Sequence, residues 1–450
     1  MRVAEVEVAA RDSVRGGTVR LRRSALAVAT LVLLIYGVWV AVYLVRGGEA
    51  RDFTTTSPVF LLTSHASSVI RYDPTYNYRI TGNMDGYDGQ FAYFIALDPA
   101  YAHCYMDVPA YRYERILYPM TARLLALGQP AFVPYTLILV NLLAAAGGTL
   151  ALAAWLKRKG VSPWLALLFG LSPGICFALQ RDLNEPLAYA LAALGVYLLD
   201  FGGRRRVLWA GIAFGLAALA RETTLVFSLV YGLTLLFAHV SQGQPREAMS
   251  QTSGPLGKET CGGQKPERSS EAHRRKLLAA ARNRVSERWR PAALLLALAV
   301  GPFALYKLFL LLWLRSAGVP AVLAPVVVPF AGILAHQPWG AEQDAIVVTV
   351  ILPALICAWL GIWVIERRLG QAAIWTLLVN VLLFVVLLNA LSYVIDGTVR
   401  ITLGVTLAAL LCVPAFDRLA RHHRGWLALC GGLWLALLPF WLVTPLLWRG

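Results

Sequence analysis

The sequence has little charge for its length. Only 15% of its 450 residues are Asp, Glu, Lys or Arg, while 58% are hydrophobic. A water-soluble chain of this size needs more charge to cover its surface. Several enzyme signatures are also missing: a Walker-type loop, a dinucleotide fingerprint, a Ser-based elbow, and zinc-ligand spacing among the six cysteines. These absences point away from a soluble enzyme.

The hydrophobic residues occur in long uncharged blocks. The first block, Ser24 to Val45, is long enough to cross a bilayer, and no small-residue cleavage site follows it. We therefore expect an all-α polytopic membrane protein with about eleven transmembrane helices and a large first outer loop that carries interfacial helices. The expected spans are 24–45, 133–156, 162–179, 185–200, 207–220, 223–240, 292–314, 345–365, 371–390, 400–416 and 426–447.

Basic residues lie in the short segments at alternate ends of these spans. If the N-terminus is cytoplasmic, the inner segments hold most of the 41 Lys and Arg, as the positive-inside rule predicts. This topology accounts for the net charge of +16 without a nucleic-acid partner. We predict an integral protein of a bacterial inner membrane, with its functional face on the periplasmic or extracellular side.

The chain divides at two long polar connections. A cytoplasmic tail, 1–23, precedes a six-span module, 24–240, whose outer connection 46–132 is dense in Tyr, Asp and Gly. Such a composition suits a compact cap with short interfacial helices. The basic stretch 241–291 has the composition of a mobile cytoplasmic linker, and anionic lipid is its expected partner. A five-span module, 292–450, completes the chain.

Each outer connection carries acidic residues, usually with an arginine within four positions. An unpaired charge at membrane depth is costly, so ionisable groups there are functional candidates. Each pair could instead neutralise itself at a helix end, and Asp-Gly is common in turns. We favour one shared polar cavity. Its candidate residues are Asp85, Asp88, Arg112, Arg115, Tyr118, Arg181, Asp182, Glu185, Arg221, Glu222, Asp396 and Arg400.

These residue types suit chemistry on a lipid phosphate. A carboxylate can act as general base toward a hydroxyl, and Asp85 and Asp88 could also hold a divalent cation such as Mg²⁺ or Mn²⁺. Arginines can bind a phosphate leaving group through paired hydrogen bonds. Grooves between spans can hold an isoprenoid tail. Together these features favour group transfer from a membrane-embedded lipid phosphate to an acceptor at the outer surface.

Four segments resemble motifs of the C-type glycosyltransferases, most closely the GPI-anchor mannosyltransferases and their bacterial relatives. "YDGQFAYFIA" (Tyr87 to Ala96) is similar to the first-loop motif, and "RILYP" (Arg115 to Pro119) to the segment that follows it. "NEPLAYALAALGVYLL" (Asn184 to Leu199) and "LAALARETTL" (Leu216 to Leu225) resemble a later span and turn. The likeness covers residues 84–230.

The resemblance implies a polyprenyl-phosphate-sugar donor and a catalytic base at Asp88. Asp85 has no clear counterpart and would be a helper or a metal ligand, while Glu185 and Arg221 would line the site. Glu222 departs from the pattern, because the family usually has a small residue or Pro there. No soluble C-terminal domain indicates the acceptor, which could be a glycan, a lipid or a protein.

Two other functions remain open. One is a multi-span transporter or flippase for a lipid-linked or small anionic substrate. Transporters usually show internal repeats and charges near the bilayer midplane, whereas this sequence has no convincing repeat and only Lys307 within a span. The other is a non-catalytic scaffold of the cell envelope, which the clustered outer carboxylates make less attractive.

Overall fold

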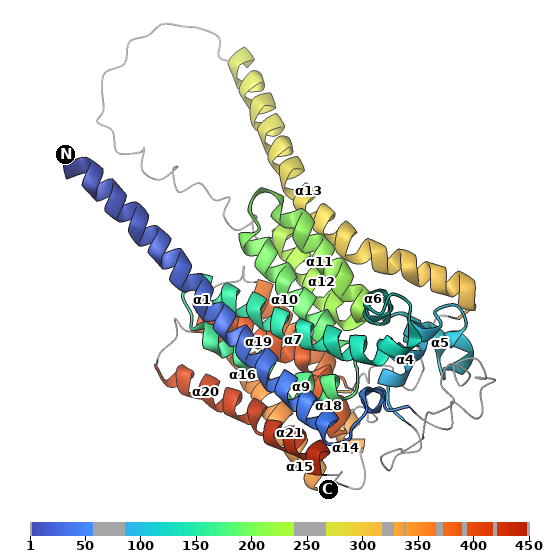
Figure 1. Ribbon diagram of the computed structural model, residues 1–450. Helices are drawn as coiled ribbons and strands as arrows, with labels where there is room; N and C mark the ends of the chain where they lie inside the picture. Colours follow the sequence, from blue (N-terminus) through green and yellow to red (C-terminus); the bar gives the residue numbers. More distant parts are fainter. Residues whose placement is uncertain are drawn as a thin grey trace, which may run out of the picture.

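The computed structural model describes residues 2–56, 86–237, 267–316, 328–335, 339–365, 372–388, 394–416 and 421–447, which form helices and no strand (Figure 1). The longer helices are α1 (Arg2–Val45), α7 (Val133–Arg158), α10 (Glu185–Phe201), α11 (Arg206–Ala220), α12 (Leu225–Phe237), α13 (Glu267–Leu314), α16 (Leu352–Ile365), α17 (Ala372–Val381), α19 (Leu403–Phe416), α20 (Arg421–Leu435) and α21 (Leu438–Leu447). The shorter ones are η1 (Ala50–Thr54), α4 (Gly89–Leu97), η2 (Ala102–Tyr105), α5 (Pro109–Tyr113), α6 (Leu117–Leu125), η3 (Pro130–Phe132), η4 (Pro163–Ala166), α8 (Leu167–Gly170), α9 (Pro173–Gln180), η5 (Gly203–Arg205), η6 (Glu222–Thr224), α14 (Ala331–Ala335), α15 (Ala341–Ile346), two π-helical turns η9 (Val347–Ile351) and η10 (Leu382–Val386), and α18 (Ile395–Ile401).

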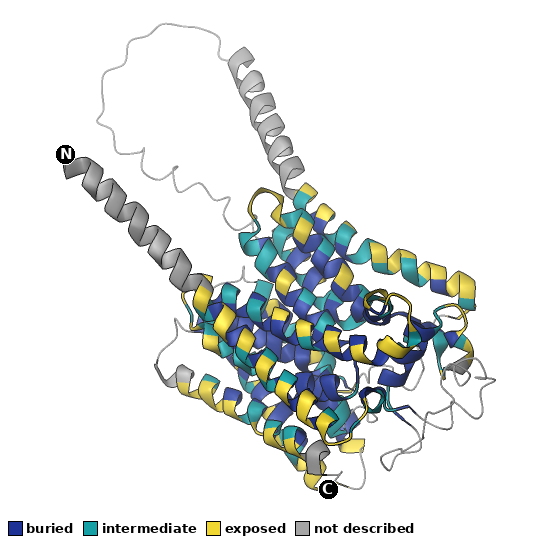
Figure 2. Cartoon of the chain, in the orientation of Figure 1, coloured by how far each residue is buried: buried dark blue, intermediate teal, exposed yellow. Residues whose placement is uncertain are grey.

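Helices long and apolar enough to cross a membrane number six in the described chain, or up to eight if each of two bent pairs is one span. The six are Arg23–Val45, Pro130–Arg158, Trp289–Leu314, Ala341–Ile365, Ile395–Phe416 and Gly425–Val443. Large apolar side chains are exposed on the outward faces of these helices (Figure 2): Leu305 is 70% and Leu312 71% exposed. Surface leucines in such numbers require a lipid environment, as in an integral membrane protein.

The expected count of eleven spans is not confirmed. The span expected at 162–179 is interrupted before Pro173, with a bend of 45° between its two pieces. A proline at the start of a helix favours such a break, because it cannot donate the hydrogen bond that would continue the preceding turn. The segments expected at 185–200 and 207–220 form a pair bent by 117°, and the described parts of those expected at 223–240 and 371–390 form the shorter apolar helices Glu222–Leu236 and Ala372–Val386.

The two modules share one hydrophobic core. In the first, α7 packs against α1 and α10, and α10 against α11. Close approach is possible because small residues lie at the contacts: a Cβ added to Gly148 would lie 2.8 Å from the Cα of Ala190. In the second, α17 packs between α16 and α19. Contacts of α12 with α17, and of α10 with α19, join the modules.

A group of short helices closes one end of the bundle (Figure 1). It comprises η1, α4, η2, α5 and α6, and α4 covers the segment that was expected to form an interfacial helix. Most residues of α4 are buried, because it packs on α6, α7 and η1 rather than lying exposed. Helix α7 runs from this end to the basic turn Lys157–Lys159 at the other. The cap and the basic turns therefore lie at opposite ends of the bundle.

Candidate functional site

Four distant segments meet beneath the cap. Asp88 directly precedes α4, Glu185 begins α10, Arg221 ends α11, and Arg400 belongs to the last turn of α18. The bundle carries these positions to the same end because successive helices run in alternate directions. Tertiary packing thus brings together charges that are up to 312 positions apart in the chain.

Asp88 lies between two arginines. Its Oδ1 accepts a hydrogen bond from Nη1 of Arg112 at 2.8 Å, and its Oδ2 accepts one from Nη2 of Arg400 at 2.5 Å. Burial raises the pKa of Asp88, but Arg400, Arg112 and, further away, Arg115 lower it by more, so the net pKa lies well below its usual range. Asp88 is therefore ionised, and in this arrangement it is a weak base.

Arg112 is fixed on both sides. Its Nε and Nη2 donate to the carboxylate of Asp107 at 2.9 and 2.7 Å, and its guanidinium lies 4.1 Å from the ring centre of Phe91. The sequence analysis did not select Asp107. The sequence could have indicated Asp107, because it lies five residues before Arg112 and just before the helical turn that begins at Pro109.

Arg400 joins Asp88 to a buried carboxylate. Its Nε lies 2.8 Å from Oε1 of Glu185, which is completely buried. Arg221, itself only 3% exposed, also forms an ion pair with Glu185. A buried carboxylate needs such partners because leaving water costs several kcal/mol per ion. Asp88, Arg400, Glu185 and Arg221 thus form a continuous chain of ion pairs.

Two further ion pairs flank this chain. Arg115 donates to Glu222 through Nε at 3.1 Å and Nη2 at 2.8 Å, a bidentate contact. Glu114 pairs with Lys307, the lysine within an expected span. Burial raises the pKa of Glu114, although the hydrogen bond from Lys307 opposes this effect. The ion pair between Lys307 of α13 and Glu114 therefore helps to hold α13 against the cap.

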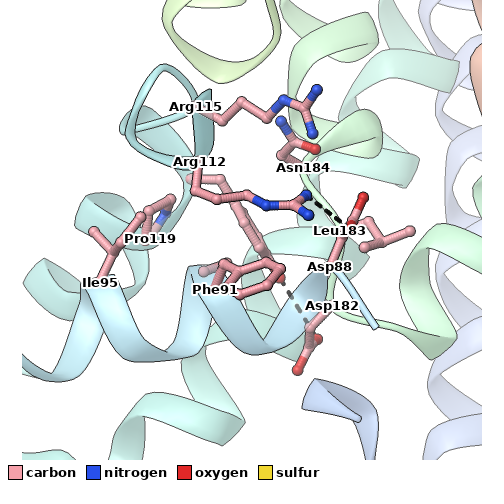
Figure 3. A pocket seen from close by; sticks show the side chains of 11 residues that line it. Asp88, Phe91, Ile95, Arg112, Arg115, Pro119, Asp182, Leu183 and Asn184 are labelled. Carbon is pink, nitrogen blue, oxygen red and sulfur yellow. Dashed lines mark hydrogen bonds and ion pairs between the residues drawn. The ribbon is translucent and has the colours of Figure 1, made fainter. Parts of the chain in front are cut away.

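A pocket borders Asp88 (Figure 3), and its empty space, with open solvent included, is about 350 Å³. Figure 3 shows the guanidinium of Arg112 pointing at Asp88, with Arg115 and Asn184 beside them. One wall is apolar and comes from α4 and α6, while the polar groups lie together on the other side. The lining residues are Asp88, Phe91, Ala92, Ile95, Arg112, Arg115, Tyr118, Pro119, Asp182, Leu183 and Asn184. The pocket thus offers charge and an apolar surface side by side.

Tyr118 and Asp182 also line the pocket. The Tyr118 hydroxyl is 2.8 Å from Nδ2 of Asn141, 3.1 Å from the Leu137 carbonyl and 3.5 Å from Oδ1 of Asp182. Asp182 is fully buried and has a φ of +47°. Burial raises the pKa of Asp182 well above its usual range, which favours the neutral form of its carboxyl group. The Tyr118 hydroxyl thus has protein partners, whereas Oδ2 of Asp182 has no hydrogen-bond partner among the described residues.

The remaining candidates lie outside the chain of ion pairs. Arg181 donates to Oγ1 of Thr55 at 3.1 Å, and burial lowers its pKa. Asp396 lies one turn before Arg400 on α18 and forms no ion pair within the described residues. Asp85 falls outside the described part of the chain.

The described carboxylates offer poor ligands for a metal ion. No group of three or more His, Cys, Asp or Glu side chains in the described ranges could hold one. Both oxygens of Asp88 face arginines, whose positive charge opposes a cation. These residues therefore fit an anion better than a divalent cation.

Comparison with known proteins gives no relative. No protein-family model, curated protein or solved structure matches this chain.

Proposed function

We propose that the protein is a membrane glycosyltransferase, which moves a sugar from a polyprenyl-phosphate donor to an acceptor at the non-cytoplasmic face. The observation that carries the proposal is a carboxylate beside a pocket, held by two arginines from different modules. Arginines suit the phosphate of the donor, the carboxylate suits the acceptor hydroxyl, and the apolar wall suits the first isoprene units.

In the proposed reaction, Asp88 takes the proton of the acceptor hydroxyl as the hydroxyl oxygen bonds to the anomeric carbon of the sugar. The bond from that carbon to the phosphate oxygen breaks, and its electron pair leaves with the phosphate. Arg112 and Arg400, which pair with Asp88, would stabilise the negative charge that develops there. Asp88 leaves the step protonated and passes its proton to solvent.

The proposal includes a membrane topology. The basic turns at 157–159 and 204–206 lie at the end opposite the cap, and by the positive-inside rule this supports the proposal that the site faces the non-cytoplasmic side of a bacterial inner membrane. We also propose that α10 and α11 cross as two short spans, because their bend of 117° turns the chain back on itself. With α8 and α9 as one span, and α12 and α17 as one each, the total is the expected eleven.

The test is sugar transfer by the purified full-length chain in proteoliposomes, with a panel of polyprenyl-phosphate sugars and glycan, lipid and peptide acceptors. We expect Asp88→Asn to abolish transfer while leaving expression and thermal stability close to the wild type. Asp98→Asn, at the other end of α4, is the matched control and should remain active, since the Asp98 carboxylate accepts a hydrogen bond from the Tyr101 backbone N–H and forms no ion pair within the described residues. Full transfer by Asp88→Asn would exclude the mechanism, and accumulation of unchanged substrate would favour transport.

A further inference from the structure

The two arginines at Asp88 are held in place by other groups. Asp107 binds the Nε and Nη2 edge of Arg112, and Phe91 lies against its guanidinium. Glu185 lies 2.8 Å from Nε of Arg400, whose guanidinium is 5.3 Å from the ring centre of Tyr87. Both arginines should therefore keep their positions if Asp88 is withdrawn.

The carboxylate of Asp88 accepts an N–H from each of the two arginines. Nη1 of Arg112 and Nη2 of Arg400 each donate to a different oxygen of the same carboxylate. Two oxygens of a phosphate present the same arrangement of acceptors to a pair of arginines. The Asp88 side chain is 28% exposed, so an incoming anion can reach it from the pocket.

We propose that Asp88 occupies the phosphate site of the protein when no substrate is bound, and that an incoming phosphate monoester or diester displaces it from Arg112 and Arg400. The proposal rests on the proposed function in one respect, that this phosphate is the donor's. Before displacement the carboxylate is neutralised by both arginines and accepts a proton poorly. After displacement the arginines face the phosphate and Asp88 is free to act as base.

Electrostatics agree with this order of events. The arginines are what lower the pKa of Asp88, while its burial acts in the opposite direction. Transfer of both guanidinium groups to phosphate removes the lowering and leaves the effect of burial, so the carboxylate becomes a stronger base. Binding of the phosphate group of the donor would then activate the base.

The experiment measures phosphate binding directly. The full-length wild type and Asp88→Asn, each in nanodiscs, are titrated with a two-isoprene alkyl monophosphate and with inorganic phosphate, by calorimetry. Removal of the internal competitor should make Asp88→Asn bind the alkyl phosphate about tenfold more tightly than the wild type, or more. Asp88→Ala also removes the carboxylate and repeats the test if the amide variant fails to fold. A gain for the alkyl phosphate alone identifies a lipid phosphate, and an equal gain for both ligands identifies the phosphate group as sufficient.

Asp107→Asn is the matched control, because it removes one negative charge from the opposite edge of the same arginine. Binding to this variant should be unchanged or weaker, since Arg112 loses its support. Equal tightening in both variants would reveal a general charge effect and overturn the proposal, as would weaker, unchanged or undetectable binding to Asp88→Asn and Asp88→Ala. Tighter binding without sugar transfer by the wild type would sustain the displacement but end the proposed function. Sugar transfer by the wild type without tighter phosphate binding by the Asp88 variants would support the proposed function but overturn the displacement.

Discussion

Gly89 offers a direct test of how the site is assembled. It is the first residue of α4, next to Asp88, and a Cβ at this position would lie 1.9 Å from the Arg181 carbonyl oxygen and 3.3 Å from that of Thr54. Both obstacles are backbone atoms, which cannot turn aside as a side chain could. Gly89→Ala must therefore separate the start of α4 from the turn at Arg181.

The required movement can be worked out from these distances. Ordinary van der Waals contact begins at 3.4 Å, so the two segments must move apart by about 1.5 Å. The Asp88 carboxylate is 2.5 Å from Arg400, and a shift of that size would take it beyond hydrogen-bond range. We expect Gly89→Ala to cost about 1–3 kcal/mol of stability from overpacking alone. It should also lower sugar transfer about a hundredfold, because the base is misplaced by more than 1 Å.

The assay is thermal unfolding in detergent, followed by tryptophan fluorescence, together with the transfer measurement. Gly147→Ala in α7 is the control, because nothing lies within 4 Å of its added Cβ. Its expected effect has the opposite sign, a gain of about 0.5–1 kcal/mol from the higher helix propensity of alanine. Equal melting temperatures for the two variants would refute the close contact between α4 and the Arg181 turn.

Two further changes test the surroundings of the pocket. Asp182 holds its proton more tightly in the folded than in the unfolded protein, so the free energy of unfolding should fall as pH rises above the ordinary Asp pKa, by about 1.4 kcal/mol per unit. Asp182→Asn removes this dependence, so the melting temperature of the variant minus that of the wild type should increase from pH 5 to pH 8. If this difference in melting temperature stays constant over that range, Asp182 is charged in the folded protein. The Arg115–Glu222 pair can be tested by a double-mutant cycle with Arg115→Met and Glu222→Gln, measured by unfolding in SDS. We expect a coupling free energy of about 1–3 kcal/mol, because the contact is bidentate and largely buried. Additive effects of the two substitutions would contradict that pairing.

The sequence by itself determined that the protein is helical and belongs in a membrane. The mean hydropathy of a segment depends only on its own residues. A block such as 24–45 can therefore be recognised as a candidate membrane span without knowing which helices pack against it. The number of spans could not be obtained in this way. It depends on bends, such as the one before Pro173, and on whether α10 and α11 count as one passage or two.

Only the tertiary structure decided which charges are partners. Sequence position does not indicate that Asp88 pairs with Arg400 or that Glu114 pairs with Lys307, because 312 and 193 positions separate the partners. Local pairs were equally plausible, yet Arg181 and Asp182 do not pair with each other, and Arg221 binds Glu185 rather than its neighbour Glu222. The Coulomb energy of an ion pair falls as the distance between the two charges increases. Helix packing, rather than sequence position, sets that distance.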